Sequence, residues 1–273
     1  MSATALAAPA PVAPVRRRPG DAIADVALFT RRGIRHQLRS LDALLLNVLL
    51  PVLLMTMFVY VFGGALSTGG SGLDYVDYVV PGVVLLTAGY GAANTAQSVA
   101  GDMVTGIVDR FRSLPVADWA VPAGHVVASV AKNLVTTAIV LAVAFAVGFR
   151  PDAGLVDWLG VVALVVLYVL AMTWLATVVG LVAGSVESAS AFSFFVLFLP
   201  YLSSAFVPVE TMPTVLRAFA EHQPITPLTD SLRGLLLDMP IGDNGWIAVL
   251  WCVGIMLVAA PLSAMLFRRR AGR

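Results

Sequence analysis

The chain has 273 residues, of which 59% are hydrophobic and only 12% are charged, and its mean hydropathy is +0.90. Soluble domains carry about 25% charged residues and about 45–50% apolar ones, so this chain has more apolar side chains than a soluble core can bury. The single cysteine, Cys252, excludes a disulfide scaffold. The net charge of +1 gives no indication of a nucleic-acid partner. Composition therefore predicts a polytopic membrane protein.

The first twenty residues are rich in Ala and Pro and end in Arg16, Arg17 and Arg18. A secretory signal peptide carries its positive charge before its apolar core and would lack these prolines. We therefore expect residues 1–20 to form a disordered tail rather than a signal peptide.

The next segment, residues 21–42, has the pattern of an amphipathic helix. Its apolar side chains fall near one helical face: Ile23, Val26, Ile34, Leu38 and Leu41. Arg31, Arg35 and Arg39 recur every four residues on another face. Such a helix lies in the membrane interface, where each Arg near anionic headgroups contributes about 1 kcal/mol. The alternative is a solvated helix that only leads into the first span.

Six apolar runs follow, each of a length that crosses a bilayer, which takes about 20 residues at a rise of 1.5 Å per residue. The six predicted spans are Leu44–Gly63, Val79–Val99, Val121–Phe149, Leu155–Val182, Ala189–Val207 and Trp246–Phe267. The second run is diluted by Gly, Ala, Asn and Gln, and the fifth is rich in Phe. The sequence thus predicts an all-α membrane domain with six transmembrane helices over residues 43–267.

Basic residues in the connecting segments set the predicted orientation. With the amino terminus inside, 13 of the 17 basic residues are cytoplasmic, and Arg150, Arg217 and Arg233 lie on the other side. Lys132 lies within the third span, and we expect its ammonium group to reach toward the cytoplasmic face. An even number of spans places both termini in the cytoplasm, including the basic tail, residues 268–273.

The sequence carries no recognisable catalytic or nucleotide-binding motif. It has no Gly-x-x-x-x-Gly-Lys-[Ser/Thr] loop to hold nucleotide phosphates, and its three histidines lie in separate segments without the spacing of metal ligands. Asn47, Asn94 and Gln97, which lie within the spans, are uncharged, and the usual acidic relay of a proton-coupled transporter is missing. We expect no enzyme activity, catalytic residue, cofactor or metal site in this chain, and an external source of energy.

The segment between the second and third spans, residues 101–118, is cytoplasmic in this orientation and mixes charged with apolar side chains. A short helix is expected to end before its proline. The central sequence is Asp109-Arg110-Phe111-Arg112-Ser113-Leu114-Pro115. Phe and Leu among charged residues suit a knob that docks into a groove of a partner protein. The alternative is a tight interfacial turn with its apolar side chains in the lipid.

A second unusual segment, residues 211–238, follows the fifth span and is too apolar for a free loop and too often interrupted by proline to cross the membrane. Thr214–His222 and Leu228–Asp238 each have about the length of a short helix. Two such helices fit a re-entrant hairpin on the outer side, provided that protein shields their ends. Pro227 suits a first helical turn, with Thr226 as its N-cap.

Two stretches resemble signature sequences of the ABC type-2 permeases, and most closely those of the actinobacterial daunorubicin-resistance permease family. They are Asp109–Val116, and Phe206–Pro213 followed by His222–Leu236. The resemblance extends from about Asp21 to Arg270. It implies the membrane core of an exporter in the bacterial cytoplasmic membrane, which moves a hydrophobic or amphiphilic drug, lipid or glycolipid.

The resemblance also implies partners. Two separately encoded ATP-binding subunits would hold ATP and Mg²⁺, and a second copy or a related permease would complete a dimer. In that family the amino-terminal helix and the first cytoplasmic loop contact the ATPase, and the hairpin caps the outer side. Carried over, residues 21–42 become the connecting helix, residues 101–118 the coupling segment with Asp109–Pro115 as its motif, and residues 211–238 the outer hairpin.

The substrate pathway is expected at the interface of the two permeases, and spans one and five are candidates for it because Met and aromatic side chains accommodate varied amphiphiles. The candidate residues are Asn47, Met55, Met57, Phe192, Phe195 and Phe198. Ordinary lipid-facing or packing residues are the alternative.

Two other classes of protein stay open as alternatives. A secondary transporter that needs no ATP predicts inverted halves with matching broken helices. An intramembrane protein that binds or modifies lipids predicts a convergent polar site.

Overall fold

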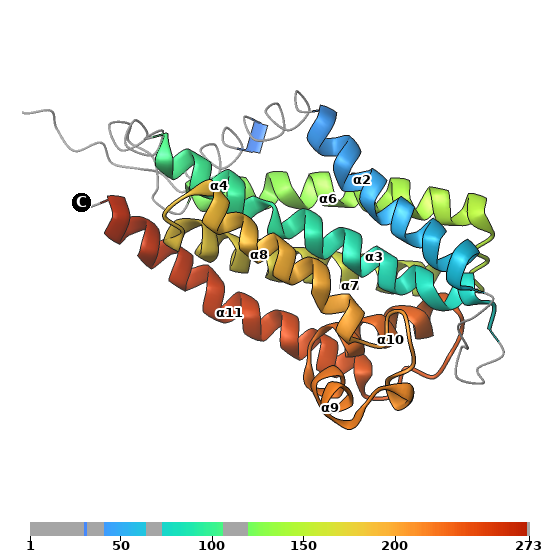
Figure 1. Ribbon diagram of the computed structural model, residues 1–273. Coiled ribbons are helices and arrows are strands. Elements are labelled where there is room, and N and C mark those ends of the chain that lie inside the picture. Colours follow the sequence, from blue (N-terminus) through green and yellow to red (C-terminus); the bar gives the residue numbers. More distant parts are fainter. Residues whose placement is uncertain (1–29, 32–40, 64–72, 106–119, 272–273) are drawn as a thin grey trace, which may run out of the picture.

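The computed structural model describes residues 30–31, 41–63, 73–105 and 120–271, and every regular element in these ranges is helical (Figure 1). Five α-helices correspond to predicted spans or parts of them. They are α3 (Tyr75–Ala93) with α4 (Thr95–Val104) directly after it, α6 (Ala120–Val147), α7 (Leu155–Val182) and α11 (Asn244–Ala271).

The remaining elements are shorter. They are α2 (Leu41–Thr56) with the π-helical turn η1 (Met57–Phe62), α8 (Val186–Phe198) with the 3₁₀ turn η2 (Leu199–Leu202), η3 (Val209–Thr211), α9 (Thr214–His222) and α10 (Ile225–Leu236).

Four helical stretches within the described ranges are long and apolar enough to cross a membrane: Tyr75–Val104, Ala123–Val147, Leu155–Val182 and Asn244–Arg269. They coincide with the second, third, fourth and sixth predicted spans and are candidates for them by length and composition. The first and fifth predicted spans coincide with the shorter apolar helices Asn47–Phe62 and Val186–Leu202. Six spans stay a prediction, because a full crossing takes about 20 residues and these two helices are shorter. The orientation of the termini also stays a prediction.

The helix pair α3–α4 is the centre of the bundle, with α2 and α6 on one side and α7, α8 and α10 on the other (Figure 1). Of the most apolar part of Tyr75–Val104, 83% lies inside the protein. Small residues allow this close packing, since atoms of Ala205, Tyr168 and Asn133 occupy the space that a Cβ would need at Gly82, Gly89 and Gly91, respectively. The Gly and Ala that lower the hydropathy of this run are therefore those that let its neighbours approach.

Gly180 on α7 gives a direct test of this close packing. A Cβ there would lie 2.5 Å from the Ala96 carbonyl oxygen and 2.8 Å from Cβ of Val99. Since backbone atoms have little room to move, we expect Gly180→Ala to lower the free energy of unfolding by about 1–3 kcal/mol, measured as a lower midpoint of thermal unfolding. At Gly254 on α11 a Cβ meets nothing within 4 Å, so Gly254→Ala is the matched control. Equal destabilisation by both changes would contradict this account.

Two short helices follow α8, as the sequence predicted, and their insertion into the membrane stays a prediction. Helix α9 has the predicted bounds, Thr214–His222, whereas α10 begins at Ile225 rather than at Leu228. The N-cap prediction for Thr226 is wrong, because the N-cap position is Pro224 and Thr226 lies inside the helix. Pro227 is still accommodated, since the first helical turn has backbone N–H groups without helical partners and proline lacks one.

Candidate functional site

The predicted coupling motif, Asp109–Pro115, lies outside the described residues, but the helices on either side of it are described. Helix α4 ends at Val104, and α6 begins at Ala120. Nε2 of His125 lies 3.1 Å from Oδ2 of Asp102, and both side chains are about one-fifth exposed. This contact joins the two helices that flank the predicted coupling segment. Nothing in the sequence indicated this contact beyond the presence of one His and one Asp.

The predicted interfacial helix, residues 21–42, is described only at residues 30–31 and at residues 41–42, which begin α2. Arg31 is exposed, and Arg35 and Arg39 lie outside the described residues. Lys132 is partly buried on α6.

The six candidate pathway residues differ in their burial. Asn47 and Met55 are buried within the protein, at 5% and 0% exposure, so these side chains pack inside this chain. Phe192 is half-buried. Met57, Phe195 and Phe198 are exposed, Phe195 at 60% and Phe198 at 59%. They therefore lie on a surface, as the predicted pathway requires.

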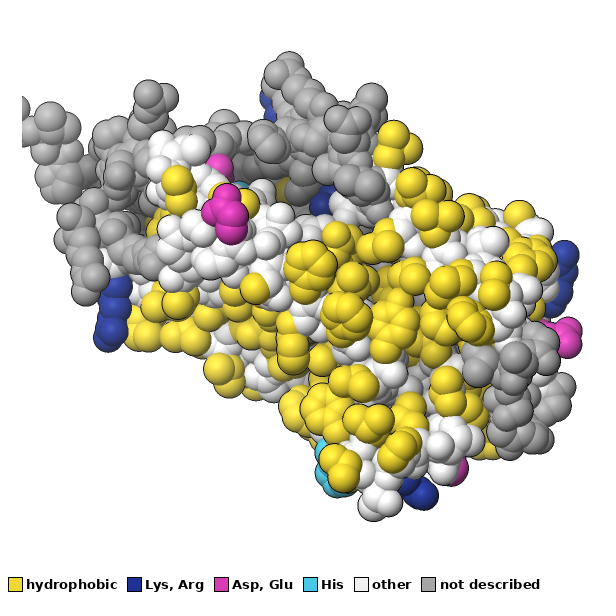
Figure 2. All heavy atoms as spheres, in the orientation of Figure 1, with side chains coloured by type: hydrophobic (Ala, Val, Ile, Leu, Met, Phe, Trp, Pro, Cys, Tyr) yellow, Lys and Arg dark blue, Asp and Glu magenta, His cyan; other side chains and the backbone are white. Residues whose placement is uncertain are grey.

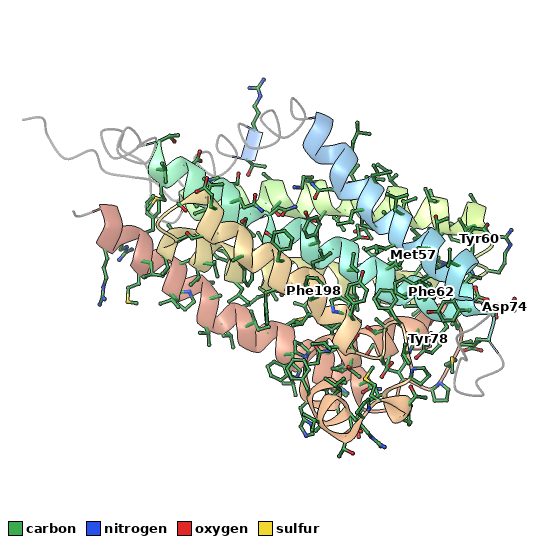
Figure 3. The ribbon with its side chains drawn as sticks, viewed as in Figure 1. Met57, Tyr60, Phe62, Asp74, Tyr78 and Phe198 are labelled. Atoms are coloured by element: carbon green, nitrogen blue, oxygen red, sulfur yellow. The ribbon has the colours of Figure 1, made fainter. Side chains whose placement is uncertain are left out.

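These exposed residues belong to a larger apolar surface, here named the α2–α8 face. Its members are Leu49, Leu53, Met57, Tyr60, Phe194, Phe195 and Phe198, all of them exposed. Figure 2 shows hydrophobic side chains over this side of the molecule, and Figure 3 shows Met57 and Tyr60 on η1 and Phe198 on α8. So large an exposed apolar surface requires a bilayer or another protein against it.

Aromatic rings connect the two edges of this face at one end. The ring of Phe58 on η1 stacks on Phe206, with 4.5 Å between centroids, and lies 6.2 Å from Tyr201 on η2. Tyr201 in turn lies 6.0 Å from Phe198. Pairs at these separations stabilise by about 0.5–1.5 kcal/mol each, so the ends of α2 and α8 are held together.

Amide and hydroxyl side chains connect the same two edges farther along. Nδ2 of Asn94 donates to Oδ1 of Asn47 on α2 at 2.8 Å. Nε2 of Gln97 on α4 donates to Oδ1 of Asn94 at 3.3 Å and to Oγ of Ser193 on α8 at 3.1 Å. We call Asn47, Asn94, Gln97 and Ser193 the polar chain. The sequence showed three of these residues as uncharged groups inside spans but gave no indication that they meet.

Helix α10 is fixed to α3 by a buried arginine. Arg233 is 7% exposed, and its Nη1 donates to Oδ1 of Asp230 at 2.8 Å. Its Nη2 donates to the carbonyl oxygens of Ser204 at 2.9 Å and Tyr78 at 3.2 Å. The guanidinium carbon lies 4.0 Å from the centre of the Tyr78 ring, a cation–π contact. Figure 3 shows Tyr78 at the end of α3 that lies beside α10.

Ser204 and Tyr78 add two further hydrogen bonds to this cluster, whereas Nε of Arg233 is buried without a partner in the described part of the chain. Oγ of Ser204 donates to Oδ1 of Asp230 at 2.7 Å, and the Tyr78 hydroxyl donates to the Ser204 carbonyl at 3.0 Å. Burial raises the pKa of the Asp230 carboxyl, and the Ser204 hydrogen bond and the Arg233 charge offset this only in part. The cluster joins α3, α10 and the segment after α8 into one rigid unit.

Two further features carry no catalytic chemistry. A groove of about 560 Å³ between α7 and α11 is lined by apolar residues, among them Leu175, Trp251 and Ile255. It offers no charged group to orient a substrate. Among the residues that the structure describes, no group of three or more His, Cys, Asp or Glu is placed to hold a metal ion.

Comparison with known proteins places the chain in a family. Residues 25–237 match the model of the ABC-2 type transporter family. The chain is 30% identical over 228 residues to the daunorubicin resistance ABC transporter permease protein DrrB1 of Streptomyces coeruleorubidus, covering 82% of this chain and 78% of the relative. It is 25% identical over 249 residues to the "Probable doxorubicin resistance ABC transporter permease protein DrrC" of Mycobacterium tuberculosis, covering 90% and 89%. The chain therefore belongs to the ABC-2 type transporter family and is homologous to the permeases of drug-resistance ABC transporters.

Proposed function

We propose that this ABC permease is the membrane subunit of an ATP-driven exporter that moves a hydrophobic or amphiphilic molecule out of the cytoplasm or the inner leaflet. The α2–α8 face carries the proposal, because it is apolar and aromatic-rich and has the polar chain across it. Such a surface suits molecules that have both apolar and hydrogen-bonding parts. The names of the relatives, which refer to daunorubicin and doxorubicin resistance, favour a drug as the cargo.

ATP hydrolysis is assigned to a separate subunit, since the sequence has no P-loop. The complex contains two copies of that subunit, with ATP and Mg²⁺, and one copy binds residues 101–118 of each permease. The residues that make this contact are Phe111, Leu114, Arg110 and Arg112. The Asp102–His125 contact supports this assignment, since it links α4 to α6 on either side of the segment that the ATPase would displace. Transmission of this kind needs contacts that differ between two states of the transporter.

The α2–α8 face is assigned to contact with a second permease, with the pathway at that interface. The protein is then a multi-pass protein of the bacterial cytoplasmic membrane with both termini inside. The helix that carries Arg31, Arg35 and Arg39 lies on the inner surface beside the ATPase, where its basic residues also meet anionic lipid headgroups.

Cysteine cross-linking tests the assigned face. In a Cys252→Ser background, we expect Phe195→Cys on α8 to give an oxidative cross-link of the mass of two permeases. Leu257→Cys on α11 is the control, since Leu257 is also exposed, at 71%, but lies outside the α2–α8 face. The yield is measured by non-reducing gel electrophoresis of membranes that contain the complex. A cross-link through Leu257 and none through Phe195 would overturn the assignment.

A further inference from the structure

One narrow polar stripe interrupts an otherwise buried helix pair. Between Val79 and Val99, every residue of α3 and α4 and of their junction is buried except Tyr90, Asn94, Gln97 and Ser98. Steps of four and three residues place these side chains on one helical face. This face lies between α2 and α8, because Asn94 bonds to Asn47 on α2 and Gln97 bonds to Ser193 on α8.

The hydrogen bonds of the polar chain leave one acceptor free. Nε2 of Gln97 donates to Asn94 and to Ser193, so the amide group is held in one orientation. An amide oxygen has two acceptor positions, and no hydrogen-bond donor in the described part of the chain reaches Oε1 of Gln97. Gln97 is partly exposed, so this oxygen is open to a molecule that enters the face.

The partly buried position of Gln97 makes the free acceptor costly. It lies seven residues before Val104, about 10 Å from the end of a helix of 30 residues, and therefore near the edge of the hydrocarbon layer. An amide group that is partly shielded from water and lacks a partner costs free energy. The neighbouring exposed residues on α8, Phe194 and Phe195, are apolar rings at 61% and 60% exposure. A bound molecule that donates one hydrogen bond and is otherwise apolar would pair with the Gln97 oxygen and pack against the two Phe rings.

We propose that Oε1 of Gln97 is the hydrogen-bond acceptor of the substrate site, and that it selects amphiphiles with an uncharged donor such as a hydroxyl or an amide N–H. This inference rests on the proposed export function and adds the substrate class to it. Asn94, Asn47 and Ser193 are positioning residues, because they fix the Gln97 amide and belong to three different helices. None of the four residues is ionisable, so the site offers no fixed charge to a charged group.

Three probes of similar size test the inference on the unmodified protein: 1-pyrenebutanol, its methyl ether and 1-butylpyrene. Binding to the permease–ATPase complex in nanodiscs is measured by fluorescence titration and corrected for partition into empty nanodiscs. We expect the alcohol to bind about three- to tenfold more tightly than the ether and the alkane, the range expected for one net hydrogen bond. Competition by daunorubicin or by added phospholipid distinguishes a drug from a lipid as the source of the donor.

Variants then assign the preference to one residue. Gln97→Met, which keeps the length of the side chain but removes its amide, is expected to abolish the preference for the alcohol and to leave binding of 1-butylpyrene within twofold. Ser98→Ala is the control, since Ser98 is the exposed neighbour outside the polar chain. Equal binding of all three probes by the unmodified complex overturns the inference, as does a preference that survives in Gln97→Met. Absence of ATP-dependent transport by the unmodified complex contradicts the proposed function instead.

Discussion

Replacement of Arg233 by methionine is expected to lower the free energy of unfolding by about 3–5 kcal/mol. The change removes the hydrogen bonds to Asp230, Ser204 and Tyr78 and leaves the Asp230 carboxyl, whose side chain is only 29% exposed, without its cation. Loss of one partner from an ion pair that is shielded from water is more costly than loss of both, because the remaining charge stays partly desolvated. The measurement is the midpoint of thermal or denaturant unfolding of the purified permease in detergent.

The neighbouring helix provides a matched control. Arg217 on α9 also pairs with an acid on its own helix, Glu221 at 2.7 Å, but its side chain is 48% exposed. We expect Arg217→Met to leave the unfolding midpoint unchanged, since exposed pairs contribute little. The double change Asp230→Asn with Arg233→Met should be less destabilising than the sum of the single changes, because no buried charge is left unpaired. An equal decrease in the free energy of unfolding from Arg217→Met would contradict the role assigned to the Arg233 cluster.

The second large effect is expected in the predicted coupling motif. Phe111→Ala and Arg112→Glu should each lower substrate-stimulated ATP hydrolysis by the complex at least tenfold. A single buried aromatic or charged side chain often supplies much of the binding free energy of an interface. Association is measured by co-purification of the ATPase with the tagged permease, and hydrolysis by phosphate release.

Arg269→Glu is the control for the charge reversal, since Arg269 is exposed near the end of α11 and lies on the same predicted side of the membrane. It should leave both association and hydrolysis near the level of the unmodified complex. If Phe111→Ala and Arg112→Glu leave both unchanged as well, the motif is not the docking site.

Apolar run length predicted the long helices well. The bounds predicted for the fourth span, Leu155–Val182, are those of α7, because its run is strongly apolar and is followed by Gly184. The bounds of the second run were predicted less well. The sequence predicted Val79–Val99, whereas the helical stretch in the structure is Tyr75–Val104. Residues near its ends are polar, and hydropathy alone does not separate a helix end from the start of a loop.

The candidate site was predicted less completely, since it depends on contacts between distant segments. Arg233 bonds to a carbonyl 155 positions away, and Gln97 bonds to a hydroxyl 96 positions away. Residue type predicted that Asn47 and Gln97 need partners inside a membrane, but not which partners they have. The same holds for Met55, where the sequence indicated an adaptable side chain and only the structure shows it to be fully buried.

Transport by the reconstituted complex tests the central claim most directly. Proteoliposomes that contain the permease and its ATP-binding subunit are loaded with ATP and Mg²⁺ on the ATPase side, and movement of daunorubicin across the membrane is followed by fluorescence. The account predicts transport that requires the ATPase and stops with vanadate. Equal transport by the permease alone, or transport that vanadate leaves unchanged, would contradict it.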